Sequence, residues 1–399
     1  MIYLDHNATS PLALELKPKI VEWLDAWGNP SSIHRAGRKP KALLRDARKA
    51  VAHMIGCDQL EVIFTSGGSE SNNLAIKGMY EFMHSPGAVL PNGFRNRYLF
   101  SSVEHPSVQQ TAEFLKSRGA EVEFISVNRE GQLDLEQYKS ILNDKTALVS
   151  VMLANNETGV IFPIREMAEL AHQHGALFHT DAVQALGKIP VNVHELGVDL
   201  ASFSGHKFYS LKGTGVLFSR KGTQLESLIH GGAQERHRRG GTENLLSIAS
   251  LGEMAKRSHE IGPKGQELKI LRDHLEDRLK NEISCLTVNS ENARRLPNTS
   301  SMIIDGVDGE TLLMNLDIMG FAVSTGAACS SGSPEPSPVL LAMGITREKA
   351  QSSLRIGLGW STTPAQIDLF IEALKEVVAR IRSFSTQDVY VAGKPRILS

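Results

Sequence analysis

Cys329 lies in the stretch STGAACSSGSP, residues 324–334, which is rich in glycine, serine, threonine and alanine. This composition is typical of a loop rather than of a helix or a strand. The nucleophilic form of cysteine is the thiolate, and a polar, partly exposed setting favours it. The other two of the three cysteines, Cys57 and Cys285, lie in apolar contexts, where a free cysteine is usually a small core residue. Cys329 is therefore the candidate nucleophile.

The stretch TSGGSES, residues 65–71, combines the end of an apolar run with two glycines and a following helical pattern. Gly68 lets the backbone approach an anion, the first helical turn offers free N–H groups, and Ser69 adds a hydroxyl. Gly-Gly-Ser before a helix is also a common tight turn, so the motif alone leaves a structural and a functional interpretation open. Because no lysine follows the glycines, the motif is not a Walker A loop.

Lys207 follows another apolar run, in the stretch SFSGHKFYSLKGTG, residues 202–215. Most lysines are solvated surface residues, so Lys207 alone indicates no function. A partly desolvated lysine near a phosphate site, however, loses its proton more readily and can form a Schiff base. Pyridoxal phosphate needs such a lysine, a phosphate cradle and a carboxylate beside its pyridine nitrogen. Asp181, at the end of ALFHTD, is the candidate carboxylate.

These residues must be positioned by the region from about residue 60 to 220, where short apolar runs alternate with helical patterns. The runs predict strands at residues 61–66, 97–103, 121–127, 146–153, 176–181, 199–205 and 214–220. Most runs are continuous, as in a mostly parallel sheet covered by helices on both faces. The sequence therefore predicts a doubly wound α/β fold, with ligands at the carboxyl ends of its strands.

The pattern changes after about residue 255, which indicates a second, smaller domain. A long charged helix is predicted over residues 264–283, and short strand-like runs follow it. The last helical pattern places Ile367, Phe370, Ile371, Leu374, Val377, Val378 and Ile381 at helical spacing. We expect this apolar stripe to be packed in the core.

Size and charge exclude several classes of protein. With 399 residues the chain is long enough for two domains, and its 41% hydrophobic and 22% charged residues are typical of a soluble globular protein. A formal net charge of -1 predicts no nucleic-acid partner. The sequence shows no apolar run of membrane-spanning length and no signal peptide in MIYLDHNATSP, so we expect no membrane association and a cytoplasmic location.

Nine motifs in order along the chain resemble the cysteine desulfurases of the NifS/IscS type, in the class V branch of the fold-type I aminotransferases. They are YLDHNAT, TSGGSESNNLAIKG, EHPSV, NNETGV, HTDAVQALGK, SGHKFYSLKGTGVL, RRGGTEN, STGAACSSGSPEPSPVLLAMG and SSLRIGLG. The resemblance implies a fold-type I transferase that depends on pyridoxal phosphate. Its large domain, residues 15–255, would carry a mostly parallel seven-stranded sheet. Residues 1–14 and 256–399 would form a smaller α+β domain with the cysteine loop.

The same resemblance assigns the residues around the cofactor ring. Lys207 would hold pyridoxal phosphate and move the α-proton of the substrate. Asp181 would keep the pyridine nitrogen protonated, and Gln184 would donate a hydrogen bond to the phenolic oxygen. Asn156 would lie near that oxygen and the substrate. His105 would stack on the ring and handle protons, although from the residues alone a histidine satisfied in a turn is the preferred interpretation.

The resemblance also assigns the phosphate site and the assembly. Gly68, Ser69, Ser204 and His206 match its phosphate-binding positions. Thr242, in GGTEN, matches a threonine that reaches the phosphate of the neighbouring subunit. The resemblance therefore implies a homodimer with active sites at the subunit interface.

The implied reaction is that of a sulfurtransferase. Arg355 would bind the α-carboxylate of L-cysteine, and the Cys329 thiolate would attack the substrate sulfur, so that L-alanine leaves and a persulfide remains. The long loop around Cys329 favours delivery to a sulfur-acceptor protein such as an iron–sulfur scaffold. The resemblance implies no metal of the protein's own, only a transient iron–sulfur ligand role for Cys329 shared with a scaffold. The tail STQDVYVAGKPRILS lacks the scaffold-docking sequence of the IscS branch, so the acceptor stays open.

Three other functions stay open. An aminotransferase of the same fold would not need Cys329, and a selenocysteine lyase would share most of the site. A non-catalytic assembly subunit could keep the fold to bind partners, but the joint presence of Lys207, Asp181, Arg355 and Cys329 argues against it.

Overall fold

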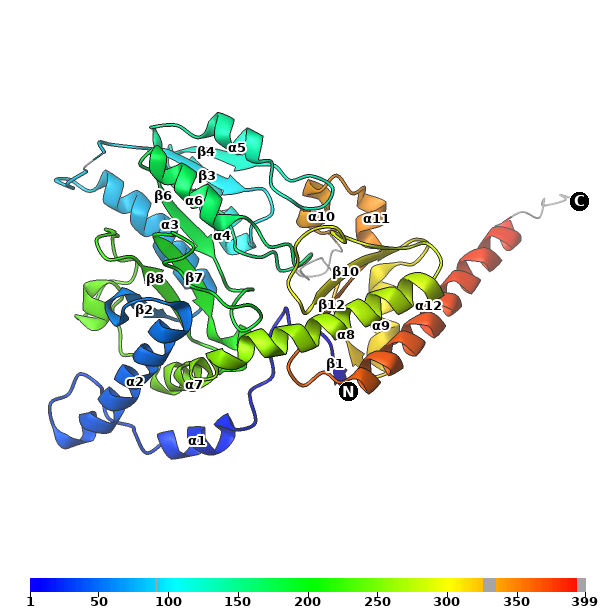
Figure 1. Ribbon diagram of the computed structural model, residues 1–399, viewed down its shortest axis with the longest axis horizontal. Coiled ribbons are helices and arrows are strands. Elements are labelled where there is room, and N and C mark those ends of the chain that lie inside the picture. The colour runs from blue at the N-terminus through cyan, green and yellow to red at the C-terminus, as the bar shows by residue number, and fades with distance from the viewer. Residues whose placement is uncertain (91, 326–334, 393–399) are drawn as a thin grey trace, which may run out of the picture.

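The computed structural model describes residues 1–90, 92–325 and 335–392. A seven-stranded sheet with the order β2-β8-β7-β6-β5-β3-β4 forms the centre of the larger region (Figure 1). Its strands are β2 (Val62–Thr65), β3 (Arg97–Ser101), β4 (Glu121–Ile125), β5 (Thr146–Ser150), β6 (Leu177–Asp181), β7 (Leu200–Ser204) and β8 (Gly215–Ser219). β8 is antiparallel to both neighbours, and the other pairs are parallel. Each strand lies within a predicted run, and the predicted α/β fold is confirmed.

Helices cover both faces of this sheet because successive strand residues point in opposite directions. Leu99 packs in one apolar cluster with residues of α2, α6 and α7, whereas Phe100 packs in another with residues of α3 and α4. The helices of this region are α1 (Leu16–Trp23), α2 (Arg38–Ile55), α3 (Gly68–His84), α4 (Pro106–Ser117), α5 (Leu135–Ile141), α6 (Ile164–Gln173) and α7 (Leu245–Ala255). Burial on both faces explains why the strands are continuously apolar.

A three-stranded antiparallel sheet with the order β12-β10-β9 forms the centre of the second region. The elements here are α8 (Ile261–Glu282), β9 (Leu286–Val288), β10 (Thr299–Ile304), α9 (Gly309–Ile318), α10 (Pro338–Ala342), α11 (Arg347–Gln351), β12 (Ser353–Gly357) and α12 (Pro364–Ala392). α8 runs from the larger region into this one (Figure 1). The predicted stripe of α12 is confirmed, since Phe370, Leu374 and Val377 are fully buried in a separate apolar cluster.

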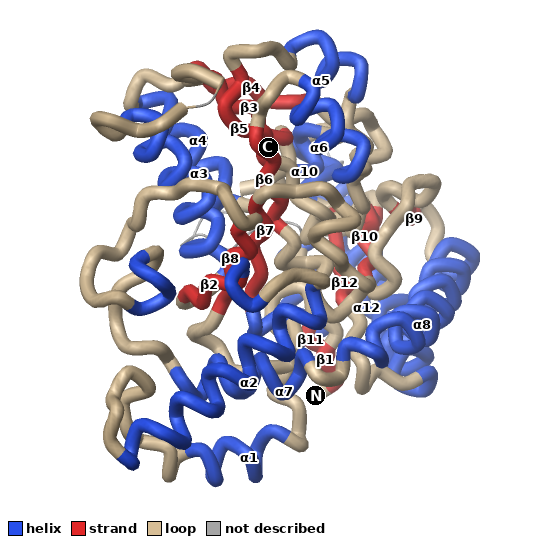
Figure 2. The backbone as a smooth tube through the Cα atoms, turned by 60° about the vertical axis from the view of Figure 1, so that its left-hand side comes forward, coloured by secondary structure: helices blue, strands red, loops and turns tan. Residues whose placement is uncertain are grey.

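The two ends of the described chain both contribute to the second region. β1 (Ile2–Tyr3) pairs in parallel with β11 (Phe321–Ala322), and Figure 2 shows the N-terminus beside this pair. After β1 the chain crosses to the larger region, where the Ser10 N–H donates to the carbonyl of His206 at 2.9 Å. The division into domains at residues 14/15 and 255/256 stays a prediction.

The two cysteines outside the loop differ in burial. Cys57 is half-buried against the main apolar cluster. The expectation of a core position for Cys285 is wrong, because this residue is exposed in the turn between α8 and β9 with a φ of 56°. Across the described ranges, no helix has the length and apolar character needed to span a membrane.

Candidate active site

A cavity of about 280 Å³ lies at the carboxyl ends of β2, β6 and β7, where ligands bind in parallel α/β sheets. Eight of the residues predicted for the site line it: Gly68, Ser69, His105, Asn156, Asp181, Gln184, His206 and Lys207. They come from five separate stretches of the larger region. The fold therefore collects in one place the side chains that the sequence distributes over about 140 positions.

Lys207 ends a single 3-10 turn (Gly205–Lys207) that directly follows β7. Its Nζ donates to the carbonyl oxygens of Asn7 at 2.5 Å and Ala8 at 2.6 Å. Burial and the positive charge of Arg355 lower the pKa of Lys207 to about 8. A substantial fraction of the amine is thus neutral near physiological pH, as a nucleophile or a base requires.

Asp181 is the last residue of β6 and is buried. Its Oδ1 accepts from the Val183 N–H at 2.9 Å, and its Oδ2 accepts from Asn72 Nδ2 at 2.7 Å. Asn72 lies in the first turns of α3, and its Oδ1 is buried with no hydrogen-bond partner among the described residues. The sequence analysis missed Asn72; an amide at helical spacing from apolar residues was the available signal.

His105 caps the N-terminus of α4, and Pro106 occupies the first turn, where its missing N–H costs nothing. The Ser107 N–H donates to His105 Nδ1 at 3.1 Å. Partial desolvation and the charge of Lys207 lower the pKa of His105, against the opposing charge of Asp181. The neutral ring therefore carries its proton on Nε2, the nitrogen left for a ligand.

Glu104, directly before His105, is a buried carboxyl group that the sequence analysis did not assign. Its Oε1 accepts from the Met152 N–H at 2.7 Å and from the Ser101 hydroxyl, and its Oε2 is buried without a partner among the described residues. Desolvation raises the pKa of Glu104 to about 8. The group is thus mostly protonated at neutral pH and adds little negative charge beside Asp181.

The glycines at the start of α3, Gly67 and Gly68, lie at one end of the cavity. A Cβ on Gly67 would meet nothing within 4 Å, whereas a Cβ on Gly68 would lie 2.7 Å from Val183 Cγ2 and 3.5 Å from Ser204 Cβ. A side chain at position 68 would therefore require Val183 to move. Ser204 is buried behind this point rather than in the cavity lining. Ser69, in the first turn of α3, lies where helical N–H groups have no intrahelical partner.

Asn7 connects the cavity to the second region, a role that the sequence analysis also missed. Its carbonyl accepts from Lys207 Nζ and from Gln184 Nε2, the latter at 3.0 Å. Its Oδ1 accepts from Lys188 Nζ at 3.0 Å, and its Nδ2 donates to Thr299 Oγ1 at 2.9 Å. Lys188 also donates to Gln184 Oε1, which fixes which end of that amide faces Asn7. Burial holds the pKa of Lys188 well below its usual range.

Besides Ser204, three predicted residues lie outside the cavity lining or beyond the described residues. Arg355, in β12, donates from Nη2 to Asp5 Oδ1 at 2.9 Å and from Nη1 to the carbonyl of Asn156 at 3.3 Å. Its Nε is buried without a partner among the described residues. Thr242 is exposed and does not line the cavity of its own chain. Cys329 lies outside the residues that the structure describes.

The segment that carries Thr242 has an unusual backbone. Glu235, Arg236 and His237 have φ angles of 46°, 58° and 64°, a left-handed run that non-glycine residues rarely adopt. Arg48 stabilises it through two hydrogen bonds to the buried Glu235 carboxylate, at 2.5 and 2.8 Å.

The same segment is bound to the start of α3. Arg239 Nε donates to Glu70 Oε1 at 2.9 Å, and Glu70 Oε2 accepts from the Ser66 N–H at 2.8 Å. The segment is thus connected to the glycine turn at the cavity.

Comparison with known proteins identifies the family. The family model described as "Aminotransferase class-V" matches residues 2–370. This chain belongs to the class-V aminotransferase family. It is 42% identical over 386 residues to "Cysteine desulfurase IscS" of Dictyoglomus turgidum, covering 96% of each chain. It is similar to the solved structure of a NifS-like protein from Rickettsia africae, with 36% identity, a TM-score of 0.84, and coverage of 95% of this chain and 99% of that one.

The name of a third similar structure states which ligand that protein binds. "SspA in complex with cysteine" matches with 30% identity and a TM-score of 0.77, covering 90% of this chain and 99% of that one. Within the class-V family, this chain therefore groups with the cysteine desulfurases of the NifS/IscS type.

Class-V aminotransferases use pyridoxal phosphate, and the residues of this cavity fit that cofactor. The amine of Lys207 and the carboxylate of Asp181 share a cavity of about 280 Å³, near the small end of ligand pockets. The open space at Gly67 and the first turn of α3 supply room and donors for a phosphate group. Within the described residues, no group of three or more histidine, cysteine, aspartate or glutamate side chains is placed to hold a metal.

Proposed function

We propose that this chain is a cysteine desulfurase that converts L-cysteine to L-alanine and retains the sulfur on Cys329 as a persulfide. The convergence of Lys207, Asp181 and Gln184 on one cavity is the observation that carries the proposal. The desulfurase relatives and the cysteine complex of a neighbour support L-cysteine as the substrate.

Bound pyridoxal phosphate supplies an electron sink that makes the α-proton of a bound amino acid acidic. Lys207, with its lowered pKa, would bind the cofactor and transfer that proton. Asp181 would hold a proton on the pyridine nitrogen, because its two hydrogen bonds position it as a carboxylate. Gln184 and Asn156 would orient the ring, and His105 would cover it.

The phosphate group of the cofactor would lie at the start of α3. Gly68, Ser69, Ser204 and His206 would surround it, and the free N–H groups of the first helical turn would donate to it. Burial and two nearby lysines lower the pKa of His206 to about 4, so its ring would act as a neutral partner.

Arg355 would bind the substrate α-carboxylate. Its guanidinium is paired with Asp5, so the substrate carboxylate would displace Asp5 or share the guanidinium with it. The Cys329 thiolate would then attack the substrate sulfur. The electron pair of the breaking C–S bond would remain with the carbon, which takes up a proton as L-alanine forms. The reaction therefore leaves the substrate sulfur on Cys329 as a persulfide and needs no external oxidant.

We further propose that the active form is a cytoplasmic homodimer that delivers sulfur to an acceptor protein such as an iron–sulfur scaffold. The exposure of Thr242 and the ion pairs that hold its segment support a contact with the partner subunit's phosphate site. Cys329 would ligate an iron–sulfur cluster only transiently, on such a scaffold.

The decisive experiment measures alanine and sulfide together, with purified protein, pyridoxal phosphate, L-cysteine and a reducing thiol. We expect equal amounts of both products and their loss in the Cys329→Ala variant, with the cofactor absorption kept. Full sulfide release by that variant would contradict the nucleophile assignment. Cofactor binding without either product would contradict the substrate assignment.

A further inference from the structure

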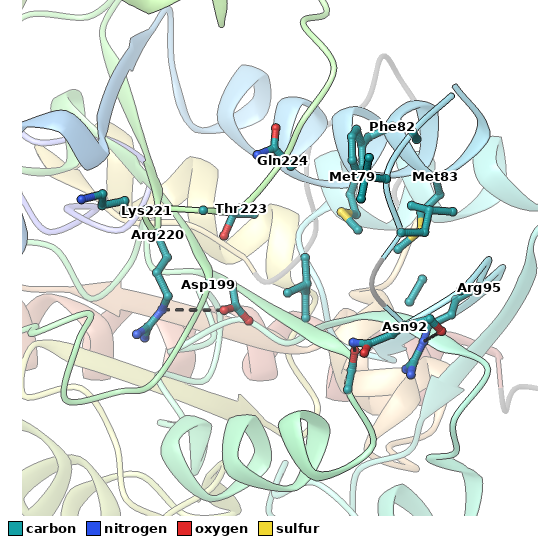
Figure 3. Close-up of a pocket in the computed structure, with 18 of the residues that line it drawn as sticks. Met79, Phe82, Met83, Asn92, Arg95, Asp199, Arg220, Lys221, Thr223 and Gln224 are labelled. Atoms are coloured by element: carbon teal, nitrogen blue, oxygen red, sulfur yellow. Dashed lines mark hydrogen bonds and ion pairs between the residues drawn. The ribbon is translucent and has the colours of Figure 1, made fainter. Parts of the chain in front are cut away.

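A second cavity, of about 730 Å³, lies at the ends of the sheet strands that are opposite the active-site cavity. Figure 3 shows this cavity. Ala147 and Leu177 contribute from the amino ends of β5 and β6, and Asp199 and Arg220 flank β7 and β8. Leu177 and Asp181 are the first and last residues of β6, so roughly 13 Å of strand separates this cavity from Asp181. None of the described lining residues belongs to the active-site cavity.

One wall of the second cavity is apolar. Met79, Phe82 and Met83 follow the i, i+3, i+4 spacing of one face of α3. Val89 and Leu90 add to this wall from the segment between α3 and β3, and Val89 is 81% exposed. A volume of about 730 Å³ lies within the range of small-molecule sites, and such a wall suits an apolar chain or ring.

The charge of the cavity is positive. Among its described lining residues, three are cations, Arg95, Arg220 and Lys221, and one is an anion, Asp199. The anion is already paired, since Asp199 Oδ2 accepts from His172 Nε2 at 2.8 Å and its Oδ1 lies 3.7 Å from Arg220 Nε. Figure 3 shows the Arg220–Asp199 pair on one side of the cavity and Arg95 on the other. Among the described residues, no carboxylate forms an ion pair with Arg95.

Arg95 is the buried cation of this cavity. It is only 8% exposed, and it forms no ion pair with the described residues. Its Nη1 donates to the carbonyls of Thr146 at 3.0 Å and His174 at 2.6 Å, and its Nε donates weakly to that of Asn92 at 3.4 Å. Its Nη2 makes no hydrogen bond within the described part of the chain. A buried guanidinium without a counter-ion that lines a cavity favours an anion there.

We propose that this cavity binds a small organic anion, a carboxylate or phosphate attached to an apolar chain. The anionic group lies at Arg95, and the apolar part packs against Met79, Phe82 and Met83. The site is independent of the proposed desulfurase reaction, because the two cavities share no described residue.

Calorimetric titration of the holoenzyme with octanoate, octyl phosphate, 1-octanol and acetate tests the proposal. We expect saturable one-to-one binding of at least one eight-carbon anion, and binding of 1-octanol that is roughly tenfold or more weaker, because it lacks the charge. Acetate should not bind, because it lacks the apolar chain. The two anions distinguish a carboxylate ligand from a phosphate ligand.

Two variants locate the site. Met83→Glu places a negative charge in the cavity and should abolish binding of both anions, whereas Met314→Glu, on exposed α9, should leave it unchanged. Arg95→Gln should weaken binding roughly tenfold if it folds. Unchanged alanine production by Met83→Glu shows that the variant is folded. Equal binding of octanoate and 1-octanol, equal effects of the two glutamate variants, or no saturable binding of either anion would overturn the proposal.

Discussion

Buried ionisable groups define the chemistry of this protein at the scale of single residues. Lys207 faces the active-site cavity and has a pKa of about 8, because burial and Arg355 disfavour its charged form. Glu157 is buried beside Arg355, accepts a hydrogen bond from the Ser337 hydroxyl, and has a pKa raised to about 7 by desolvation. Both groups hold protons differently in the folded and unfolded chain, so each has a measurable pH signature.

The amine of Lys207 should become reactive at lower pH than an ordinary lysine. In the apoprotein, we expect its rate of acetylation to rise with pH and level off with a midpoint near pH 8, because the neutral amine is the reactive form. An unstructured lysine peptide, with a pKa of about 10.4, serves as the control and should continue to rise. Mass spectrometry of pulse-labelled protein gives both rates, and coincident midpoints would contradict the assignment.

Glu157 should make the protein less stable as pH rises. Its folded pKa lies above the unfolded value, so its contribution to the free energy of unfolding is present below about pH 4.5 and is lost as pH rises through about 7. Glu157→Gln should remove up to about 3 kcal/mol of this decline between pH 5 and 8. Urea unfolding across that range measures it, with the exposed Glu113→Gln as the matched control. Parallel pH curves for wild type and Glu157→Gln would refute the prediction.

At the scale of elements, polar contacts rather than strand pairing position the segments around the cavity. Residues 5–10 lie between the two regions, and Asn7 connects them. It contacts Lys207 and Lys188 on one side and Thr299 of β10 on the other. The left-handed segment at residues 235–237 is held by the Arg48–Glu235 pair, whose side chains are 13% and 2% exposed.

Removing one partner of that pair should be costly, because a buried charge is left alone. We expect Arg48→Met to lower the free energy of unfolding by about 3 kcal/mol or more. The double variant Arg48→Met/Glu235→Gln should lose less than the sum of its single variants. Arg45→Met, in an exposed pair, is the control and should change stability by less than about 1 kcal/mol. Thermal unfolding that does not separate Arg48→Met from Arg45→Met would exclude a stabilising role for the pair.

At the scale of the whole molecule, the active-site cavity lies where the two regions meet. The larger region supplies most of the lining residues, the N-terminal segment supplies Ala8, and the second region supplies Arg355, which reaches the carbonyl of Asn156. Thr242 is exposed in the single chain and does not line this cavity, so its proposed contribution to catalysis would come through a partner subunit.

Subunit complementation tests that arrangement. Lys207→Ala and Thr242→Ala homodimers should each be impaired, whereas a mixed dimer should recover activity, because one site then has Lys207 from one subunit and Thr242 from the other. Recovery should approach half of the wild-type alanine production per dimer. Mixing wild type with a Lys207→Ala/Thr242→Ala double variant is the control, and its mixed dimers should contain no site with both residues intact. If Thr242 acts within its own chain, the mixed dimers of the control keep an intact site, and those of the two single variants do not recover activity.

Local patterns in the sequence determined the strands of the large sheet, the apolar stripe of α12 and the positions of Lys207, Asp181 and the glycine turn. These features could be predicted because continuous apolar runs are needed wherever a strand is buried on both faces, and because ligands collect where such strands end. The prediction that Cys285 lies in the core failed because local patterns do not fix every position. An apolar neighbourhood in sequence does not determine whether a residue lies in a strand or in the turn before it.

Only the tertiary structure decided which distant residues meet. Asn72 contacts Asp181, Asn7 contacts Lys188, and Arg355 contacts Asp5, although each pair is separated by more than 100 positions in the chain. Such contacts depend on the order of the strands in the sheet and on the return of the N-terminal segment to β11. Arg95, which has no ion-pair partner in the described part of the chain, and its cavity likewise follow from tertiary packing, because no local pattern specifies which charges are left without a counter-ion once the chain is folded.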